Sequence, residues 1–231
     1  MNRFVTTTCA LASAALLIGA ISGIGSVSAK PSDVRGAEST PLEYTARYGS
    51  DASSLGFVMN KWMDPKGEKK VGVKGTFHTY AVELNRPVAS LKTLSDLDGL
   101  KARIVVDLAS VDTANPARNL NVITSYFETK QFAQAVVDLA HFRAVGTTTP
   151  GAVSAEVLAD GNLTMHGITM PLSSAHLKVS KSPSGIEITT LAPISVASVD
   201  YELSAAALMK VCGHAGLDPA AAVTVTLALH P

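Results

Sequence analysis

Histidine and cysteine side chains are the residues of this sequence that could bind a metal ion, and their spacing argues against a metal site. The histidines never stand two or four residues apart, the spacing typical of a metal-binding pair on one element: His78, His141, His166, His176, His214 and His230. Cys212 is the one cysteine outside the N-terminal segment, and a lone cysteine usually behaves as a small buried hydrophobe. The sequence therefore predicts no metal centre.

Hydrolytic chemistry also has little support in the sequence. It contains no G-x-S-x-G nucleophile elbow, no phosphate-binding loop and no dinucleotide-binding glycine fingerprint. Asp107 and Asp112 flank Ser110 near the end of an expected strand, where short acidic side chains usually cap turns. A hydrolase that uses a histidine such as His166 stays open as an alternative, because a catalytic triad is recognised only by its geometry. We expect a protein that is not an enzyme and uses no cofactor.

Composition and charge exclude one class of partner. The 231 residues are 47% hydrophobic and 16% charged, with 19 basic and 19 acidic side chains and only 5% aromatic residues. A nucleic-acid-binding protein is expected to carry an excess of basic residues, and often aromatic rings on which bases stack. We therefore expect a globular protein with a substantial apolar core and no nucleic-acid partner.

The first 29 residues are typical of a secretory signal peptide. A basic residue, Arg3, precedes an apolar stretch that is interrupted by glycines, and Val27-Ser28-Ala29 supplies the small residues that a signal peptidase reads. Cleavage after Ala29 predicts a periplasmic or secreted protein; an uncleaved N-terminal anchor is the alternative. Residues 30–53 are expected to form a mobile tail and a first strand, and residues 54–231 one domain.

Strand patterns dominate the rest of the chain. Apolar residues alternate with polar ones in several segments, and a period of two is the signature of a half-buried strand. The clearest case lies between Lys101 and Val111, where the side chains expected to face inward are Ala102, Ile104, Val106 and Leu108. We expect further strands within residues 42–47, 69–84, 133–145, 153–159, 163–179, 186–191 and 223–229, and residues 55–63 are apolar at many positions. Turn residues between several of these segments favour an antiparallel barrel or sandwich.

The connections between the strands include turns and two helix candidates. Residues 64–67 form a turn signal, and residues 85–99 are expected to be a long polar connection. Residues 204–212 predict a helix with Ser204 at its N-cap and Gly213 closing it, and residues 117–128 are compatible with a second short helix. Asp160-Gly161-Asn162 is expected to break one strand, and His166-Gly167 to bend the next one at a corner of the barrel.

The interior of the barrel is the expected binding site. Small inward residues such as Ala102, Ala155, Ala159 and Ala175 either leave a lumen or pack a tight core, and the sequence does not decide between them. An apolar lumen would suit a long hydrocarbon chain, since each buried methylene group contributes about 0.8 kcal/mol. The residues expected to contact that chain are Ile104, Val106, Leu108, Phe127, Leu163 and Met165. The residues expected to hold a polar head group are His78, Tyr80, Arg118 and His166.

Several motifs resemble those of the YceI family of periplasmic proteins. They are Leu108-Ala109-Ser110-Val111-Asp112-Thr113, Arg118-Asn119-Leu120, Tyr126-Phe127, and residues 161–169 followed by Pro171-Leu172. A weaker match is Asp200-Tyr201-Glu202-Leu203, where the family usually has a glycine in place of Glu202. The resemblance implies an all-β, antiparallel lipocalin-like barrel of about eight strands with one or two short helices.

The resemblance also implies a function. Proteins of this family bind polyisoprenoids or other long-chain lipids, so we expect an exported carrier of an isoprenoid or fatty-acyl lipid. A stress-response or protein-interaction module on the same barrel is the other alternative. The sequence is compatible with a transient membrane contact and with a homodimer, and tests neither of them.

Overall fold

The computed structural model describes residues 46–48, 53–146 and 152–231. The expected signal peptide, most of the expected tail and most of the threonine-rich loop before Gly151 lie outside these residues. No helix in the described part of the chain is long and apolar enough to cross a membrane. The strands are β1 (Ala46–Tyr48), β2 (Ser54–Trp62), β3 (Lys70–Phe77), β4 (Tyr80–Leu84), β5 (Ala102–Asp107), β6 (Val111–Asp112), β7 (Gln134–Ala144), β8 (Ser154–Met165), β9 (Ile168–Ser182), β10 (Gly185–Thr190), β11 (Ile194–Ala197), β12 (Gly216–Leu217) and β13 (Ala220–Leu229).

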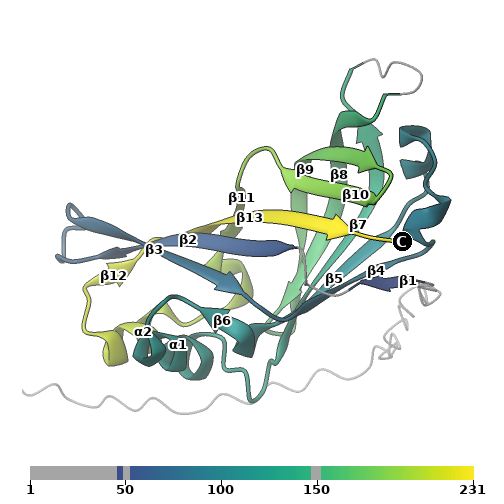
Figure 1. Ribbon diagram of the computed structural model, residues 1–231. Helices are drawn as coiled ribbons and strands as arrows, with labels where there is room; N and C mark the ends of the chain where they lie inside the picture. Colours follow the sequence, from purple (N-terminus) through teal and green to yellow (C-terminus); the bar gives the residue numbers. More distant parts are fainter. Residues whose placement is uncertain (1–45, 49–52, 147–151) are drawn as a thin grey trace, which may run out of the picture. The chain divides into compact units, whose positions relative to one another are not determined.

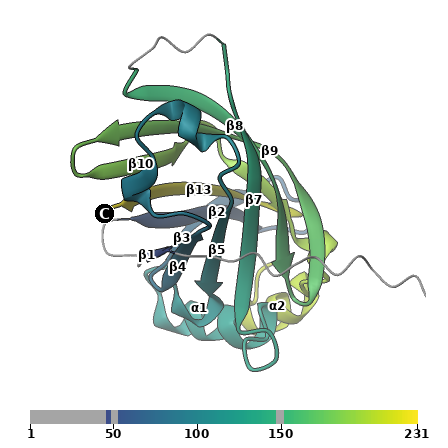
Figure 2. The same cartoon turned by 90° about the vertical axis from the view of Figure 1, so that its right-hand side faces the viewer.

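The strands form one antiparallel sheet that curls into a barrel (Figures 1 and 2). From β7 to β10 each strand pairs with the next one along the chain, and β10 then pairs with β13. β13 pairs with β2, and β2 with β3. Apolar and polar residues alternate along most of these strands, so one face of the sheet turns its apolar side chains into the barrel.

The expected strand number was about eight, whereas the sheet of the described residues contains thirteen strands. The difference arises from bends and from short edge segments. The chain bends at His78-Thr79 between β3 and β4, and a 3-10 turn, η3 (Leu108–Ser110), separates β5 from β6. Pairing of β3 with β6 brings the sheet back to β5 and thereby completes the barrel. The all-β barrel predicted from the sequence is therefore confirmed, with more and shorter strands.

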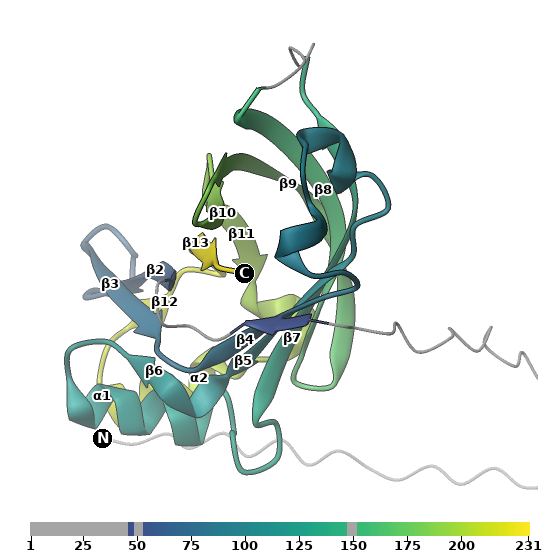
Figure 3. The same ribbon diagram turned by 45° about the vertical axis from the view of Figure 1, so that its right-hand side comes forward.

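Two short helices lie together at one end of the sheet, next to β6 (Figure 3). The first, α1 (Pro116–Asn121), has Asn115 as its N-cap and continues into a π-helical turn, η4 (Val122–Tyr126). The second, α2 (Ala205–Cys212), matches the prediction: Ser204 Oγ accepts a hydrogen bond of 3.1 Å from Ala207 N, and Gly213 ends the helix with φ of 66°. The sequence thus predicted α2, and α1 with η4 occupies the segment that was only compatible with a helix.

The connection between β4 and β5 differs from the prediction of a polar loop. It contains two 3-10 turns, η1 (Val88–Ser90) and η2 (Leu94–Leu97), and contacts β10. Figure 2 shows these turns lying near β10 and β8. The buried apolar side chains of this connection are separated by multiples of three residues, and a 3-10 helix with three residues per turn places such positions on one side. They are Val88, Leu91, Leu97 and Leu100.

The structure of the β8–β9 hairpin contradicts both predictions made for this segment of the chain. Asp160-Gly161-Asn162 does not break the strand but stays within β8 as an irregularity in the pairing with β9. His166-Gly167 is not a bend within a strand but the turn between β8 and β9, with φ of 55° and 79°. A two-residue turn of this kind requires positive φ at both positions, which a glycine supplies at low cost.

Candidate functional site

A cavity of about 440 Å³ lies inside the barrel. This volume falls in the range of small-molecule sites, about 300–1,000 Å³. Its wall is formed mainly by aliphatic and aromatic side chains that point inward from β2, β5, β7, β8, β10 and β13. Ala102 and Ala175 belong to the wall, whereas Ala155 and Ala159 do not. The inward-facing strand positions therefore leave a lumen instead of packing a solid core.

One end of the cavity is apolar. The connection between β4 and β5 contributes Leu91, Leu97 and Leu100 to the wall, and all three are almost fully buried. Their side chains therefore cover this end with hydrocarbon. The sequence prediction missed this part of the site, although the three-residue spacing of its leucines was a signal that could have revealed it.

The other end of the cavity is polar and opens between the two helices. The exposed residues of the wall are Asn115, before α1, and Val211, in α2. Polar wall residues at this end come from α1, β2 and the chain after α2: Arg118, Asn121, Lys61 and His214. No aspartate or glutamate of the described residues belongs to the wall. The mouth of the cavity therefore combines two cationic side chains with no opposing carboxylate.

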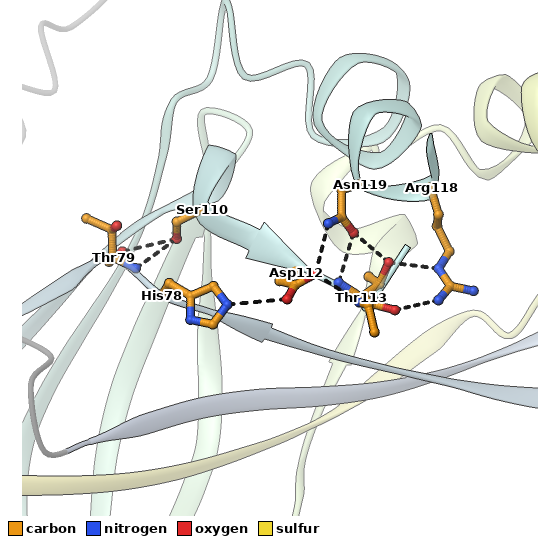
Figure 4. A network of polar contacts seen from close by, with 8 residues as sticks. His78, Thr79, Ser110, Asp112, Thr113, Arg118 and Asn119 are labelled. Carbon is orange, nitrogen blue, oxygen red and sulfur yellow. Dashed lines mark hydrogen bonds and ion pairs between the residues drawn. The ribbon is translucent and has the colours of Figure 1, made fainter. Parts of the chain in front are cut away.

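Arg118 is positioned by a chain of hydrogen bonds (Figure 4). Its Nε donates to Thr113 Oγ1 at 2.8 Å and its Nη2 to the Thr113 carbonyl at 2.5 Å. Thr113 in turn donates its hydroxyl and its backbone N–H to Asn119 Oδ1, at 2.6 and 2.8 Å. Thr113 is 4% exposed, so these bonds are formed largely out of water, where they are strong. The network fixes the guanidinium group at the cavity wall.

The same network continues to the protein surface at Asp112. Asn119 Nδ2 donates to Asp112 Oδ1 at 2.9 Å, and His78 Nε2 lies 3.5 Å from Asp112 Oδ2. The hydrogen bond from Asn119 is the main cause that lowers the pKa of Asp112 below its ordinary value. This carboxylate is thus ionised at neutral pH, but it belongs to the network and not to the cavity wall.

His214 and Tyr126 are the titratable wall residues whose environment shifts their pKa. Burial is the main cause that lowers the pKa of His214, and Lys61 lowers it further, so the imidazole is neutral at neutral pH. Burial raises the pKa of Tyr126, whose hydroxyl shares a hydrogen bond of 2.6 Å with Ser198 Oγ. The positive charge at the mouth therefore comes from Lys61 and Arg118.

The structure brings most of the predicted site residues together. Seven of the ten belong to the cavity wall: Ile104, Val106, Leu108, Arg118, Phe127, Leu163 and Met165. They come from β5, η3, α1, the turn after η4 and β8. The three others, His78, Tyr80 and His166, do not reach the wall. That the seven contact a ligand stays a prediction.

The three misplaced residues have physical explanations. His78 occupies the bend between β3 and β4, and its side chain is 66% exposed because the alternation of faces is interrupted there. Tyr80 is buried in the core at the start of β4 without reaching the lumen. His166 lies in the β8–β9 turn, where its ring packs on Phe132 with centroids 3.9 Å apart and its Nε2 lies 3.1 Å from Glu128 Oε2. These three side chains therefore lie outside the cavity wall, and their role as head-group ligands stays a prediction.

Lys61, Asn121 and His214 are wall residues that the sequence prediction missed. They lie on β2, on α1 and after α2, so their meeting depends on the pairing of β12 with β2 and on the contact between the two helices. Asn121 Nδ2 also lies 3.5 Å from Cys212 Sγ across the two helices. No local pattern in the sequence connects these positions.

Comparisons with known proteins support the fold. The model of the YceI-like domain matches residues 48–230. Among solved structures, a polyisoprenoid binding domain from Saccharophagus degradans, implicated in plant cell wall breakdown, has a TM-score of 0.62 and 21% identity, and the match covers 80% of this chain and 99% of that one. BcnA of Burkholderia cenocepacia has a TM-score of 0.53 and 15% identity over 75% of this chain and 94% of that one.

A mutant YceI protein of Campylobacter jejuni is also similar, with a TM-score of 0.50 and 13% identity over 69% of this chain and 84% of that one. No curated protein sequence matches the chain. At these identities the structural matches establish a shared architecture, while the family match covers nearly all of the described residues.

Proposed function

This chain belongs to the YceI-like domain family, and we propose that it binds a long-chain apolar amphiphile, an isoprenoid or a fatty-acyl lipid, inside its barrel. In this proposal the protein is exported, as its N-terminal sequence suggests, and carries or sequesters the lipid without changing it covalently. The observation that carries the proposal is the cavity itself, whose wall is apolar over most of its extent.

Hydrocarbon burial would provide the affinity. About ten methylene groups transferred from water into such a cavity contribute roughly 8 kcal/mol at ~0.8 kcal/mol each. Association costs about 4 kcal/mol or more in lost translational and rotational freedom. A long chain is therefore needed before binding becomes tight, and short-chain compounds would bind weakly or not at all.

The polar mouth favours a particular head group. Arg118 is held at the wall by Thr113, and Lys61 lies at the same end of the cavity. A phosphate or carboxylate head group would accept hydrogen bonds from both cations, and such charge-assisted bonds are about twice as strong as neutral ones. We therefore propose an anionic head group at the helical end and a hydrocarbon tail that extends toward Leu91 and Leu97.

A pair of neighbouring alanines in β13 provides a matched test. Ala221 belongs to the cavity wall and pairs with Val196, another wall residue, whereas Ala222 pairs with Ser195 and lies on the opposite face of the strand. Ala221→Phe would place a ring in the lumen, while Ala222→Phe adds the same volume outside it. The measurement is the thermal midpoint of each protein with farnesyl phosphate or palmitate added.

We expect the long-chain ligand to raise the midpoint of the original protein and of Ala222→Phe by about 5 °C or more at a concentration near 100 times Kd. Ala221→Phe should show a much smaller rise, and butyrate should have no effect on any of the three. Equal rises for both variants, or no rise for the original protein with either long-chain ligand, would argue against binding in the lumen.

A further inference from the structure

The hairpin formed by β2 and β3 carries a concentration of positive charge that the cavity does not explain. In Figure 1 it projects away from the rest of the sheet, beyond β12 and the two helices. Residues 54–77 contain five lysines, Lys61, Lys66, Lys69, Lys70 and Lys74, but only two acidic residues, Asp64 and Glu68. The chain as a whole has no net charge, so this segment is locally basic within a neutral protein.

Most of this charge faces solvent. Lys70 is paired with Asp218, with 2.7 Å between Nζ and Oδ1. Lys66, Lys69 and Lys74 are exposed, and no ion pair joins them to another of the described residues. The carboxylate of Asp64 accepts backbone hydrogen bonds within the turn, from residues 66, 68 and 69, and forms no ion pair with these lysines. Even with Asp64 and Glu68 counted as negative, the five lysines leave an excess of three positive charges on the hairpin.

Apolar side chains of the cavity wall continue onto the same hairpin outside the cavity. Met59 of β2 pairs with Val73 of β3, and both belong to the wall. The next pair on this face is Lys61 with Val71, since side chains opposite each other on antiparallel strands share a face. Val71 is 41% exposed, and Met63, in the bend that follows β2, is 47% exposed. An apolar track therefore leads from the lumen to the tip of the hairpin.

The mouth of the cavity lies beside this surface. Val211 of α2 belongs to the wall and is 51% exposed, and β12, which follows α2, pairs with β2. A hairpin that combines exposed apolar side chains with lysines suits the interface of a bilayer, where the apolar groups enter the head-group region and the lysines attract anionic lipids. The charge and the chemistry of an anionic membrane therefore match this basic, partly apolar surface beside the mouth of the cavity.

We propose that the β2–β3 hairpin docks the protein on the surface of an anionic lipid bilayer, with the mouth of the cavity turned toward the membrane. Docking itself requires no ligand in the lumen, and only its purpose, the exchange of lipid with the bilayer, rests on the proposed function. The occupant of this surface is thus an anionic membrane, and a protein partner would be an alternative outcome of the test.

Vesicle sedimentation tests this proposal with a matched pair of variants. The purified protein, with its N-terminus determined by mass spectrometry, is mixed with vesicles of phosphatidylcholine alone or with 30% phosphatidylglycerol. One variant replaces Lys66, Lys69 and Lys74 by Gln; the control replaces Lys92, Lys101 and Lys178, which are also exposed but lie outside the hairpin, by Gln. Both variants change the net charge equally, and the phosphatidylcholine arm corrects for insertion of the apolar N-terminal segment.

Each lysine near an anionic surface is worth about 1 kcal/mol, so we expect the hairpin variant to lose about 100-fold in its partition onto the anionic vesicles. The control variant should lose less than threefold, and salt should release the original protein. Native mass spectrometry of the same variants reports lipid in the lumen separately.

The proposal is overturned if the original protein does not sediment with anionic vesicles beyond its phosphatidylcholine level. It is also overturned if the two triple variants lose affinity equally. If docking fails in one of these ways but mass spectrometry still finds lipid in the lumen, the proposed function stands without the docking surface. If the protein docks normally but its lumen is empty, the docking surface stands and the proposed function fails.

Discussion

At the scale of single residues, Glu202 adopts a backbone conformation that suits glycine. It follows η5 (Ser198–Tyr201) with φ of 53°, in the left-handed region, where a side chain costs about 1–2 kcal/mol. This is the position at which the sequence departs from the glycine that is usual in the family. We expect Glu202→Gly to raise the free energy of unfolding by about 1 kcal/mol, since relief of this strain exceeds the added flexibility of the unfolded chain.

Urea denaturation measures this change. Glu202→Ala serves as the control, because alanine removes the charge but keeps the side-chain strain, and it should give no comparable gain. A Glu202→Gly protein that is no more stable than the Glu202→Ala protein would show that the left-handed conformation carries no significant cost here.

Asp218 joins β12 to the β2–β3 hairpin through three hydrogen bonds. Its carboxylate accepts them from Lys70, Trp62 and Asn60, each at 2.7 Å. These bonds, the one from Lys70 first, lower the pKa of Asp218 to about 2. A carboxylate with a lowered pKa stabilises the folded state at a pH above its unfolded pKa of about 4, and that contribution disappears as the pH falls toward 2.

We therefore expect the original protein to lose about 1–2 kcal/mol of stability between pH 5 and pH 2 through this group. Asp218→Asn should be less stable at pH 7 and should lose correspondingly less on acidification. Urea midpoints followed by Trp62 fluorescence at the two pH values measure the difference. Parallel pH profiles for Asp218→Asn and the original protein would contradict the assignment.

At the scale of elements, Gly161 allows β7 and β8 to approach each other closely. A Cβ atom at this position would lie 2.5 Å from the Asp138 carbonyl oxygen and 2.7 Å from Leu139 Cδ2. We expect Gly161→Ala to destabilise the protein by about 1–3 kcal/mol, because the backbone of β7 would have to move. Gly72→Ala on β3, where the nearest atom lies at 3.4 Å, should cost much less in the same unfolding experiment. Equal losses of unfolding free energy in the two variants would show that the close approach of β7 and β8 does not require a glycine at position 161.

The elements that the sequence predicted are those whose signals are local. The alternation in residues 102–108 and the capping residues of α2 identify β5 and α2 directly, because burial of one face and satisfaction of helix ends depend on neighbouring residues. The connection of residues 85–99 was misjudged as polar, since its buried leucines follow a period of three that resembles neither a strand nor an α-helix. Asp160-Gly161-Asn162 was misjudged because strand pairing overrides its turn composition.

At the scale of the whole barrel, the sequence predicted the apolar wall of the site better than its polar mouth. Ile104, Val106 and Leu163 were found because their strands alternate. Arg118 and His166 were both expected at the mouth of the barrel, but only Arg118 belongs to the wall, since His166 lies in the β8–β9 turn. Lys61 and His214 come from distant segments and meet only after folding, so single-sequence patterns contain no signal for them.

The mouth and the basic hairpin suggest different roles for the two ends of the barrel in a lipid carrier. The leucines of the β4–β5 connection cover the apolar end, while Lys61, Arg118 and the hairpin face the helical end. A lipid would then enter tail first through the mouth between α1 and α2, and its anionic head would remain near the cations. This direction of entry matches the proposed orientation of the mouth toward a membrane.

The central claim is that the lumen holds a lipid, and native mass spectrometry of the protein purified without added lipid tests it most directly. We predict a population heavier than the polypeptide by the mass of one long-chain amphiphile, absent from Ala221→Phe and present in Ala222→Phe, with the same compound recovered by organic extraction. A protein that carries only the polypeptide mass, yields no lipid on extraction and takes up none when it is offered would contradict the account.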